Sequence, residues 1–468
     1  MPLRTQIFPP IITIYDLLKT TSRKFFITKK NILPQAELVL KRNDVDGKII
    51  AAPHLYPHQW LWDSCFAAIG LSHFDWPRAA QEINSLLDGQ WKDGFIAHIK
   101  YDERHLQYWP DPKVWAANIL KKSPTGILTS GITQPPTLAL AAWQVFQNTP
   151  RGKSKEGIKF LKKVFPKIKK YHLWLNKYRD PQDIGLLYII HPWESGLDNS
   201  PLFDSVINSI GKNIPKKIKT LVDKNRRDNK IVNRKERPTQ SHYYAYIYLV
   251  DLFKKYNYNQ KKIYQHCPFL VYDVLFNSIW AKSNFDLASI AEILALKREQ
   301  KFFYNLYQQT KRALNKTLWN EENHQFFDFD LKNNRYITVK TISTFMPLYA
   351  KIPNNTRGKH LIEKHLLNTK EFLTKHPFAS TSKDESAFDS QRYWRGPTWV
   401  IINWLMIKSL GRYGYYKEVK EIKEKTLNLI IKNGFREYFN SLNGQGLGDI
   451  DQSWSAALTI DLLKLDEN

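Results

Sequence analysis

Residues 191–201 bring together several groups that can do chemistry. Two carboxylates, Glu194 and Asp198, lie with Trp193 and Asn199 around a glycine, and a proline stands near each end of the segment. Because prolines disfavour helix, the pattern predicts an ordered loop whose polar side chains need hydrogen-bond partners. That mixture suits a sugar, which offers C–H patches to aromatic faces and hydroxyls to carboxylates and amides. In the alternative interpretation the segment is a turn, and Asp198 or Asn199 caps the next helix.

Four further stretches combine aromatic, polar and small residues in a similar way. They are residues 56–63, 131–136, 391–399 and 434–454. Their glycines and prolines predict loops, and apolar residues at helical spacing follow them. In the first stretch, Asp63 is either a site residue or the N-cap of the helix that follows. Since all these loops precede helices, we expect them to meet at one end of a helical toroid.

The elements that must position these loops are mainly helical. The expected helices span residues 31–42, 64–71, 78–87, 137–146, 158–178, 241–256, 269–281, 286–318, 398–410, 416–431 and 453–463, with a short hairpin at 326–339. So little strand argues against a parallel-sheet enzyme. The pattern favours an all-α (α/α)6 barrel with short β-hairpin and loop insertions at the active-site mouth. We expect an amino-terminal extension over 1–30 and a single catalytic domain over 31–468.

The composition is that of a globular protein with an excess of basic residues. The 468 residues are 43% hydrophobic and include 15 tryptophans, more than a core needs. Lys and Arg number 70 against 44 Asp and Glu, which gives a net charge of +26. Such an excess raises nucleic acid as a partner, but the lysines are spread along the chain without an arginine-rich block. We therefore expect no nucleic-acid partner and a mild attraction for anionic small molecules.

The sequence favours a cytoplasmic location. Cys65 and Cys267 lie in apolar sequence and predict no disulfide framework, which is typical of a reducing compartment. The first residues contain Arg4, Asp16 and several prolines, which are untypical of a signal peptide. No apolar run reaches the roughly 20 residues of a membrane span. We expect no membrane partner, and the sequence leaves the oligomeric state open.

Taken together and in this order, the five stretches resemble glycoside hydrolase family 63, which contains trehalase-like and processing α-glucosidase-like enzymes. Within that family the chain is most similar to the bacterial mannosylglycerate and glucosylglycerate hydrolases. The resemblance runs from about residue 37 to residue 463, and its most specific parts are 193–201 and 393–398. It implies an (α/α)6 barrel with the active site in its mouth, and hydrolysis with inversion. The lysine-rich stretch 214–235 and the leader depart from the family pattern.

The resemblance implies that Asp198 is the general acid and Glu437 the general base. An inverting glycosidase needs such a pair about 6.5–9.5 Å apart, with room for a water molecule between them. The apolar neighbours of Asp198 favour a raised pKa, which suits an acid. Arg436 and Tyr438 flank Glu437 and favour its ionised form, which suits a base. A surface ion pair between Glu437 and Arg436 is the alternative.

The resemblance also implies a set of substrate-binding residues. The positions that match residues around the sugar ring are Trp62, Asp63, Gln134, Trp394 and Trp399. Those that match the grip on a glycerate carboxylate are Arg237, Tyr243, Tyr393 and Gln452. The same stretches supply further candidates: Tyr56, Trp60, Trp193, Asn199, Gly396 and Trp454. A planar guanidinium suits a carboxylate; alternatively, Arg237 pairs with Glu236 or with a neighbouring helix and only shapes a lid. Arg395 is a candidate for an ion pair with Asp389 or Glu385.

We therefore expect an inverting α-glycosidase that hydrolyses an α-linked glucosyl- or mannosyl-glycerate to hexose and glycerate. One alternative is a trehalase-like α-glucosidase acting on a neutral glucoside, and a more distant one is a non-catalytic protein that binds carbohydrate or nucleic acid. Pro57 separates His54 from His58, and nucleophile and nucleotide motifs are absent from the sequence, so we expect no metal and no cofactor. Residues 378–384 and 214–235 are candidate flaps that exclude water.

Overall fold

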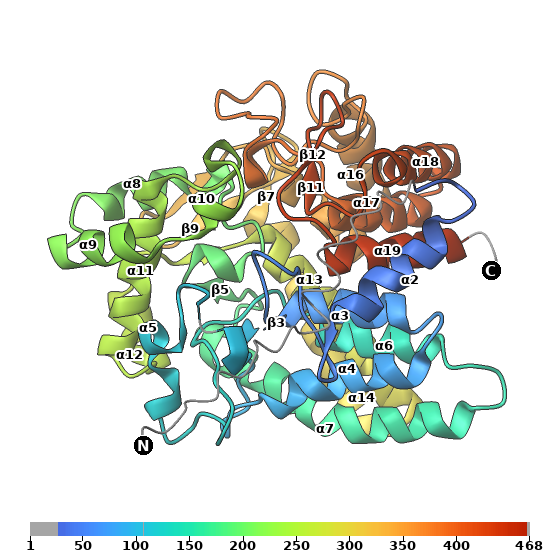
Figure 1. The fold of residues 1–468 in the computed structure, drawn as a ribbon, viewed down its shortest axis with the longest axis horizontal. Helices are drawn as coiled ribbons and strands as arrows, with labels where there is room; N and C mark the ends of the chain where they lie inside the picture. The colour runs from blue at the N-terminus through green and yellow to red at the C-terminus, as the bar shows by residue number, and fades with distance from the viewer. Residues whose placement is uncertain (1–26, 106, 466–468) are drawn as a thin grey trace, which may run out of the picture.

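The computed structural model describes residues 27–105 and 107–465, which fold mainly into helices (Figure 1). The α-helices are α2 (Ile32–Arg42), α3 (Leu61–Leu71), α4 (Trp76–Asp88), α5 (Pro112–Trp115), α6 (Leu138–Gln147), α7 (Ser154–Arg179), α8 (Asp204–Gly211), α9 (Lys216–Asn225), α10 (Asp228–Ile231), α11 (Gln240–Lys255), α12 (Gln260–His266), α13 (Val274–Ile293), α14 (Lys297–Ala313), α15 (Met346–Tyr349), α16 (Asn355–His360), α17 (Val400–Arg412), α18 (Tyr416–Asn433) and α19 (Ser453–Lys464). Of the extension expected over 1–30, residues 1–26 lie outside the described residues.

Short strands join the helices. They are β1 (Asp44–Val45), β2 (Lys48–Ile49), β3 (Gln59–Trp60), β4 (Ile99–Lys100), β5 (Tyr188–Ile189), β6 (Val271–Tyr272), β7 (Trp319–Asn320), β8 (Gln325–Phe326), β9 (Asp328–Asp330), β10 (Arg335–Ile337), β11 (Tyr438–Phe439) and β12 (Gly446–Leu447). The hairpin expected at 326–339 is confirmed: β9 pairs antiparallel with β10, and β6 and β5 extend it into a four-stranded sheet. β3 and β6 lead into α3 and α13, so strand pairing places the loops before these helices.

An inner set of helices closes into a ring. Going round it, α3, α6, α13, α15, α17 and α19 contact one another in turn, and α19 packs against α3. The sequence explains why these helices lie inside: all eleven residues of α3 are buried, as are nearly all of those in α17 and α19. A helix that is apolar on every side is stable only where neighbours cover every side. The expected (α/α)6 barrel is confirmed.

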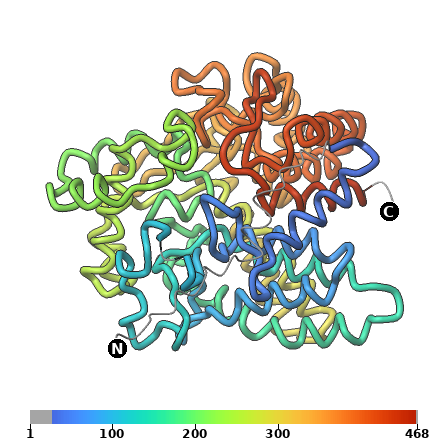
Figure 2. Tube along the Cα trace, viewed as in Figure 1, coloured from blue at the N-terminus to red at the C-terminus, as the bar shows by residue number. Residues whose placement is uncertain are grey.

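An outer layer of helices covers this ring. α4, α7, α14 and α18 each follow an inner helix and pack against it. In α7, Phe160, Val164 and Ile168 are buried at helical spacing while most of its lysines face solvent, the pattern of a helix with one apolar face. α2 packs against α19, and Figure 2 shows these first and last described helices side by side. The two ends of the described chain therefore complete the barrel together.

The stretch 214–235 lies in a group of short helices beside the barrel, drawn in green in Figure 1. It forms α9, α10 and the 3-10 turn η5 (Arg234–Glu236). Arg226 is buried and bonds to Asp228, to Gln240 and to the carbonyl of Pro238, so it ties this stretch to the start of α11. The candidate flap is thus an ordered helical segment, which we call the side segment (residues 214–238).

Two sequence predictions about local structure are wrong. The helices expected at 269–281 and 286–318 have other bounds: α13 ends at Ile293 and α14 begins at Lys297, and α13 runs unbroken through Ser283 and Asn284, where a gap between helices was expected. Both side chains are buried, and they donate to the carbonyls of Pro136 and Trp280. Polar residues with such partners do not end a helix. The second candidate flap, at residues 378–384, is largely buried: its first five residues are inaccessible to solvent.

Two carboxyl groups meet at the start of α13. Asp273 caps the helix by accepting from the Phe276 amide at 2.6 Å, and Asp328 on β9 accepts from the Val274 amide at 2.8 Å. Burial raises the pKa of Asp273 to about 7. Burial and the neighbouring Asp273 raise the pKa of Asp328 well above its ordinary value. The pair therefore holds at least one proton at neutral pH.

We expect this pair to make stability depend on pH. Both folded-state pKa values exceed the roughly 3.9 of an unfolded Asp, so the stabilising contribution is complete below about pH 4 and is lost as the pH rises through about 7. Asp328→Asn should remove the contribution of Asp328 and keep that of the buried Asp273, a change on the order of 1–3 kcal/mol. Denaturant unfolding of both proteins at about pH 6 and pH 9 measures it. An identical pH dependence in the two proteins would contradict the shared proton.

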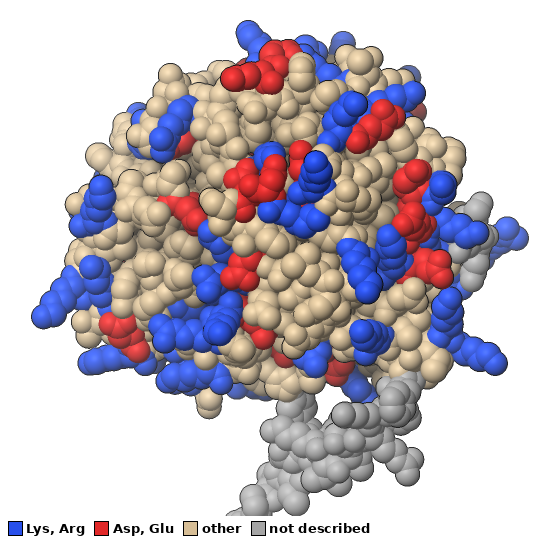
Figure 3. All heavy atoms as spheres, turned by 90° about the horizontal axis from the view of Figure 1, so that it is seen from above, with Lys and Arg blue, Asp and Glu red and all other residues tan. Residues whose placement is uncertain are grey.

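The basic residues are dispersed on the face seen in Figure 3. Lys and Arg lie there among acidic and uncharged residues and do not form one continuous basic surface. Within the described part of the chain, no helix is both long and apolar enough to cross a membrane.

Candidate active site

A pocket opens at the N-terminal ends of the inner helices. Trp62 and Asp63 lie in the first turn of α3, Gln134 precedes α6, and Gln452 is the N-cap of α19. The residues that line the pocket are Ala51, Tyr56, Trp60, Trp62, Asp63, Tyr108, Gln134, Trp193, Gly196, Asp198, Arg237, Tyr243, Tyr393, Trp394, Glu437, Gln452 and Trp454. Most of the predicted site residues therefore meet in one place. Some stand at the start of ring helices α3, α6 and α19, and others, among them Asp198 and Arg237, come from loops that precede α8 and α11.

Buried polar contacts hold the loop that carries Asp198. Glu194 forms an ion pair with Arg179 at 2.7 Å, and both residues are almost completely inaccessible to solvent. The Glu194 carboxylate also accepts from the amides of Ile190 and Thr133. Glu194 is therefore a structural residue: it binds the loop to the strand before it and to the stretch that carries Gln134.

The tip of this loop passes directly over an indole. Gly196 has a φ of +77°, and a Cβ atom there would lie 2.5 Å from the ring of Trp62. Only glycine accommodates that conformation and that approach together. The turn after the tip is capped by Ser200, so the interpretation of Asp198 or Asn199 as a helix cap is wrong.

The Asp198 carboxyl faces the pocket. Its backbone is fixed by Tyr246 on α11, whose hydroxyl donates to the Asp198 carbonyl at 2.5 Å. Burial raises the pKa of Asp198 to about 7, against the opposing influence of Arg237. The predicted direction of this shift, and desolvation as its cause, agree with the structure.

Glu437 lies just before β11 and is 1% exposed. The hydroxyl of Tyr56 donates to its Oε1 at 2.9 Å, and the amide of Asp449 donates to its Oε2 at 3.1 Å. Gly448 has a φ of +66°, and a Cβ there would lie 2.3 Å from Oε2, so a side chain at this position would displace the carboxylate.

The electrostatic surroundings of Glu437 differ from the sequence prediction. Burial raises its pKa to about 7, although Arg237 and the hydrogen bonds from Asp449 and Tyr56 lower it. The cation beside it is Arg237, whose Nη1 lies 3.7 Å from Oε1. The predicted surface ion pair with Arg436 is wrong because Glu437 is buried. The flanking residues Arg436 and Tyr438 do not keep the Glu437 carboxyl ionised.

Arg237 is a buried cation that lines the same pocket as the two carboxyls. It is 4% exposed, its Nε donates to Asp228 at 3.0 Å, and its guanidinium lies 4.4 Å from the ring centre of Tyr393. Its Nη1 has no hydrogen-bond partner among the described residues. Of the predicted alternatives, pairing with Glu236 is wrong because Glu236 instead accepts from the Gly448 amide at 2.8 Å, whereas pairing with a neighbouring helix is confirmed by Asp228, the first residue of α10. A buried guanidinium with an unused donor is suited to an anionic group of a ligand.

Asp63 is a third carboxyl in the pocket. The helix cap is Trp60, and Asp63 lies inside the first turn, so its interpretation as an N-cap is wrong. Burial, with a smaller contribution from Glu437, raises the pKa of Asp63 to about 8. Its carboxyl is therefore mostly protonated at neutral pH and can donate as well as accept a hydrogen bond.

Three predicted binding residues do not line the pocket. Trp399 is fully buried and stacks on Trp394, with ring centres 3.7 Å apart, so it supports the tryptophan that does line it. Asn199 is buried and bonds to His242 on α11. Gly396 donates its amide to a serine hydroxyl behind the pocket. Trp399 and Asn199 contribute to the walls indirectly, because Trp399 stacks on Trp394 and Asn199 follows Asp198, and both of those partners line the pocket.

Some features of the site were not predicted from the sequence. Tyr108, Ala51 and Gly196 line the pocket. The only sequence signal for Tyr108 is the aromatic pair that it forms with the next residue. Arg395 pairs with Asp204 at 2.6 Å and not with Asp389 or Glu385, because the chain brings α8 beside this loop.

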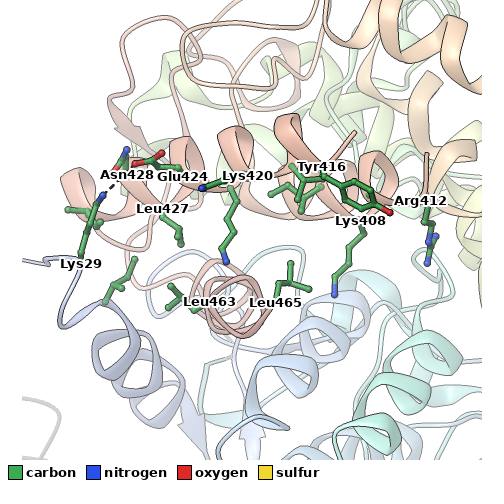
Figure 4. Close-up of a pocket in the computed structure, with 16 residues that line it drawn as sticks. Lys29, Lys408, Arg412, Tyr416, Lys420, Glu424, Leu427, Asn428, Leu463 and Leu465 are labelled. Carbon is green, nitrogen blue, oxygen red and sulfur yellow. Dashed lines mark hydrogen bonds and ion pairs between the residues drawn. The ribbon is translucent and has the colours of Figure 1, made fainter. Parts of the chain in front are cut away.

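A larger groove lies on the outside of the barrel between α18 and α19 (Figure 4). Its volume is about 1000 Å³, and leucine, isoleucine and lysine stems dominate its lining. Lys29 pairs with Glu424 there, and Lys408 pairs with Asp461. Among its described lining residues, Glu424 is the single carboxylate, whereas acid–base cleavage of a glycosidic bond needs two. The paired-carboxyl chemistry therefore belongs to the pocket inside the ring.

Comparison with known proteins agrees with this geometry. The model of a family described as the mannosylglycerate hydrolase MGH1-like glycoside hydrolase domain matches residues 56–455. The chain belongs to this family. It is 36% identical to a mannosylglycerate hydrolase of Rubrobacter radiotolerans over 439 residues, which are 93% of this chain and 97% of that protein. It is 31% identical to a glucosylglycerate hydrolase of Mycolicibacterium hassiacum over 447 residues, 93% of this chain and 98% of that protein.

A solved glycoside hydrolase of the family has the same fold. The crystal structure of the family 63 mannosylglycerate hydrolase from Thermus thermophilus, in complex with Tris and D-glycerate, matches with a TM-score of 0.83 and 36% identity. The match covers 92% of this chain and 99% of that one. The chain is thus a member of a glycoside hydrolase family over nearly its whole described length.

For this glycoside hydrolase we expect a bell-shaped dependence of kcat/KM on pH. Asp198 must be protonated to act as an acid, so activity falls as the pH rises through about 7. Glu437 must be ionised to act as a base, so activity also falls as the pH drops through about 7. The two limits coincide, which predicts a narrow maximum near pH 7. Initial rates at low substrate concentration between about pH 5 and 9 measure it; a flat profile contradicts the assignment.

Proposed function

We propose that this chain is an inverting α-glycosidase that hydrolyses an α-linked glucosyl- or mannosyl-glycerate to hexose and glycerate. One arrangement carries the proposal: the partly buried carboxyl of Asp198 and the buried carboxyl of Glu437, each with a pKa of about 7, line one pocket with the unused donor of Arg237. Membership in a family whose relatives are named mannosylglycerate and glucosylglycerate hydrolases supports the substrate class.

In this mechanism Asp198 is the general acid and Glu437 the general base. Asp198 gives its proton to the glycosidic oxygen as the bond between that oxygen and the anomeric carbon breaks. Glu437 takes a proton from a water molecule whose oxygen bonds to the anomeric carbon from the opposite face. The hexose leaves as the β-anomer and glycerate leaves with the proton from Asp198. Exchange with solvent then returns both carboxyls to their starting states.

The raised pKa values suit both roles. A carboxyl with a pKa near 7 holds a proton for part of the time at neutral pH and can also release it. Hydrogen bonds from Tyr56 and from the Asp449 amide stabilise the ionised form of Glu437 before the reaction. Asp198 has no such pair of donors in the described contacts, which favours its protonated form.

Arg237 binds the carboxylate of the leaving group in this proposal. Its Nη1 donor is unused, and Tyr243 and Tyr393 line the pocket beside it. Gln452 has a buried Oε1 without a partner in the described structure, which can accept a hydrogen bond from a substrate hydroxyl. A neutral aglycone would leave the buried Nη1 of Arg237 without a hydrogen-bond partner, a cost that favours an acidic one.

A substrate screen tests the proposed function. The purified protein is assayed for hexose release from glucosylglycerate, mannosylglycerate, trehalose, kojibiose and maltose. We expect the two glycerates to be cleaved with the highest kcat/KM. Preferential cleavage of trehalose or maltose would show a general α-glucosidase instead.

We also propose a cytoplasmic location, supported by the two buried free cysteines, Cys65 and Cys267.

A further inference from the structure

A second cavity opens directly outside the active-site pocket. This vestibule has a volume of about 600 Å³. It shares four residues with the pocket: Tyr56, Tyr108, Arg237 and Tyr243 line both. These side chains form the passage between the two spaces. A substituent on the outer end of a bound aglycone therefore enters the vestibule.

The wall of the vestibule formed by the side segment is positively charged. Lys224, Arg227 and Lys230 line it within seven residues of sequence, and all three are exposed. In the described structure none of the three makes an ion pair or a side-chain hydrogen bond. Three neighbouring cations without counter-charges, at the rim of a concave space, attract an anion more strongly than the same charges on a convex surface.

The acidic groups near the vestibule do not neutralise this wall. Asp228 is the single carboxylate among its described lining residues. Its two oxygens are already engaged by Arg226, at 2.7 and 3.1 Å, and by Arg237, at 3.0 Å. On the opposite wall, Arg104 is paired with acidic side chains outside the vestibule. The unpaired charge therefore comes from the three cations of the side segment.

These observations indicate a second anionic group beyond the carboxylate that Arg237 holds. Glycerate has two hydroxyls, and the glycosidic bond uses one of them. With the sugar in the inner pocket and the carboxylate on Arg237, the passage leads from the aglycone towards the vestibule. A phosphate ester on the free hydroxyl is an anion of the size and charge that lysine and arginine bind well.

We propose that the vestibule is a phosphate-binding subsite and that the enzyme also hydrolyses glycosides of phosphoglycerate. This inference rests on the proposed function, because it extends the same leaving-group site. The reaction is unchanged: the glycosidic bond breaks, water supplies the new hydroxyl of the hexose, and Asp198 protonates the leaving oxygen. The phosphate ester stays intact and leaves with the glycerate.

A binding experiment tests the subsite independently of catalysis. Glycerate and phosphoglycerate are titrated into the full-length protein by calorimetry at low ionic strength. We expect phosphoglycerate to bind about tenfold more tightly, given a fewfold contribution from each exposed cation. The variant K224A/R227A/K230A should lose this preference. The matched control K212A/K216A/K219A removes three exposed cations of the same region that do not line the vestibule, and should keep it.

A kinetic experiment tests the substrate. We expect wild-type protein to hydrolyse the phosphoglycerate glycoside with a kcat/KM at least equal to that for the glycerate glycoside. The ratio of the first kcat/KM to the second should fall about tenfold in K224A/R227A/K230A. Equal affinities for the two acids, or an unchanged ratio in this variant, would overturn the subsite. If phosphoglycerate binds preferentially but neither glycoside is cleaved, the proposed function fails and the subsite stands. If the glycerate glycoside is cleaved and the phosphoglycerate glycoside is not, the second substrate is refuted and the proposed function stands.

Discussion

Asp198→Asn is expected to lower kcat by about 10²- to 10⁴-fold, because an amide cannot deliver a proton to the leaving oxygen. The fold should be unaffected, since the contact that fixes this part of the loop is made by the Asp198 backbone carbonyl with Tyr246. Glu437→Gln should lower kcat to a similar extent by removing the base that activates water. Steady-state kinetics on the best substrate of the screen, with thermal unfolding of each variant, measure both effects.

A carboxyl-to-amide change outside the pocket is the control for these variants. Glu424→Gln alters a side chain of the outer groove in the same chemical way and should leave kcat within about twofold of wild type. Near-normal turnover in Asp198→Asn or Glu437→Gln would refute that residue's role. Stereochemistry provides a separate check: NMR of the first product from an α-linked substrate should show the β-anomer. Release of the α-anomer would exclude inversion.

Arg237→Ala is expected to reduce kcat/KM about ten- to a hundredfold more for a glycerate glycoside than for the corresponding glycerol glycoside. The two substrates differ in the carboxylate, which is the group that a buried guanidinium binds. Arg237 also lowers the pKa of Asp198 and Glu437, so its removal shifts the pH optimum upwards. That second effect acts on both substrates, and the ratio of the two kcat/KM values therefore isolates the carboxylate contact.

The matched control is Arg234→Ala, which removes an exposed arginine of the same side segment that does not line the pocket. It should change neither the ratio nor the pH optimum. Arg237→Lys keeps the charge without the planar pair of donors, and we expect it to recover only part of the selectivity. Equal losses on the two substrates in Arg237→Ala would show that Arg237 only shapes the pocket.

The sequence by itself determined the ring of helices. The inner helices are apolar on nearly every side, and the outer helix α7 has one apolar face, so burial follows from the local pattern. The loops rich in glycine and proline precede those helices in the sequence. Parallel packing in a ring then brings the residues before α3, α6 and α19 to one end. Asp198 and Glu437 were paired through the family resemblance, and the loop of Asp198 leads into α8, which is not a helix of the ring.

Only the tertiary structure decided which group interacts with which. Arg237 pairs with Asp228 of α10 and approaches Glu437, whereas the sequence offered either its neighbour Glu236 or a neighbouring helix without naming the partner. Adjacent residues share a backbone but point their side chains in different directions, so proximity in sequence was a poor guide. Similarly, α13 continues through polar residues, because their partners lie on the loop before α6 and within α13 itself.

The protonation states also depend on the tertiary structure. The flanking Arg436 and Tyr438 favoured an ionised Glu437, yet burial raises its pKa to about 7. The sequence did indicate the raised pKa of Asp198, because its apolar neighbours are local. It did not indicate that of Asp63, which was predicted as a site residue or a helix cap and lines the pocket. A pKa follows the loss of water and the charges within a few ångströms, and segments distant in sequence supply both.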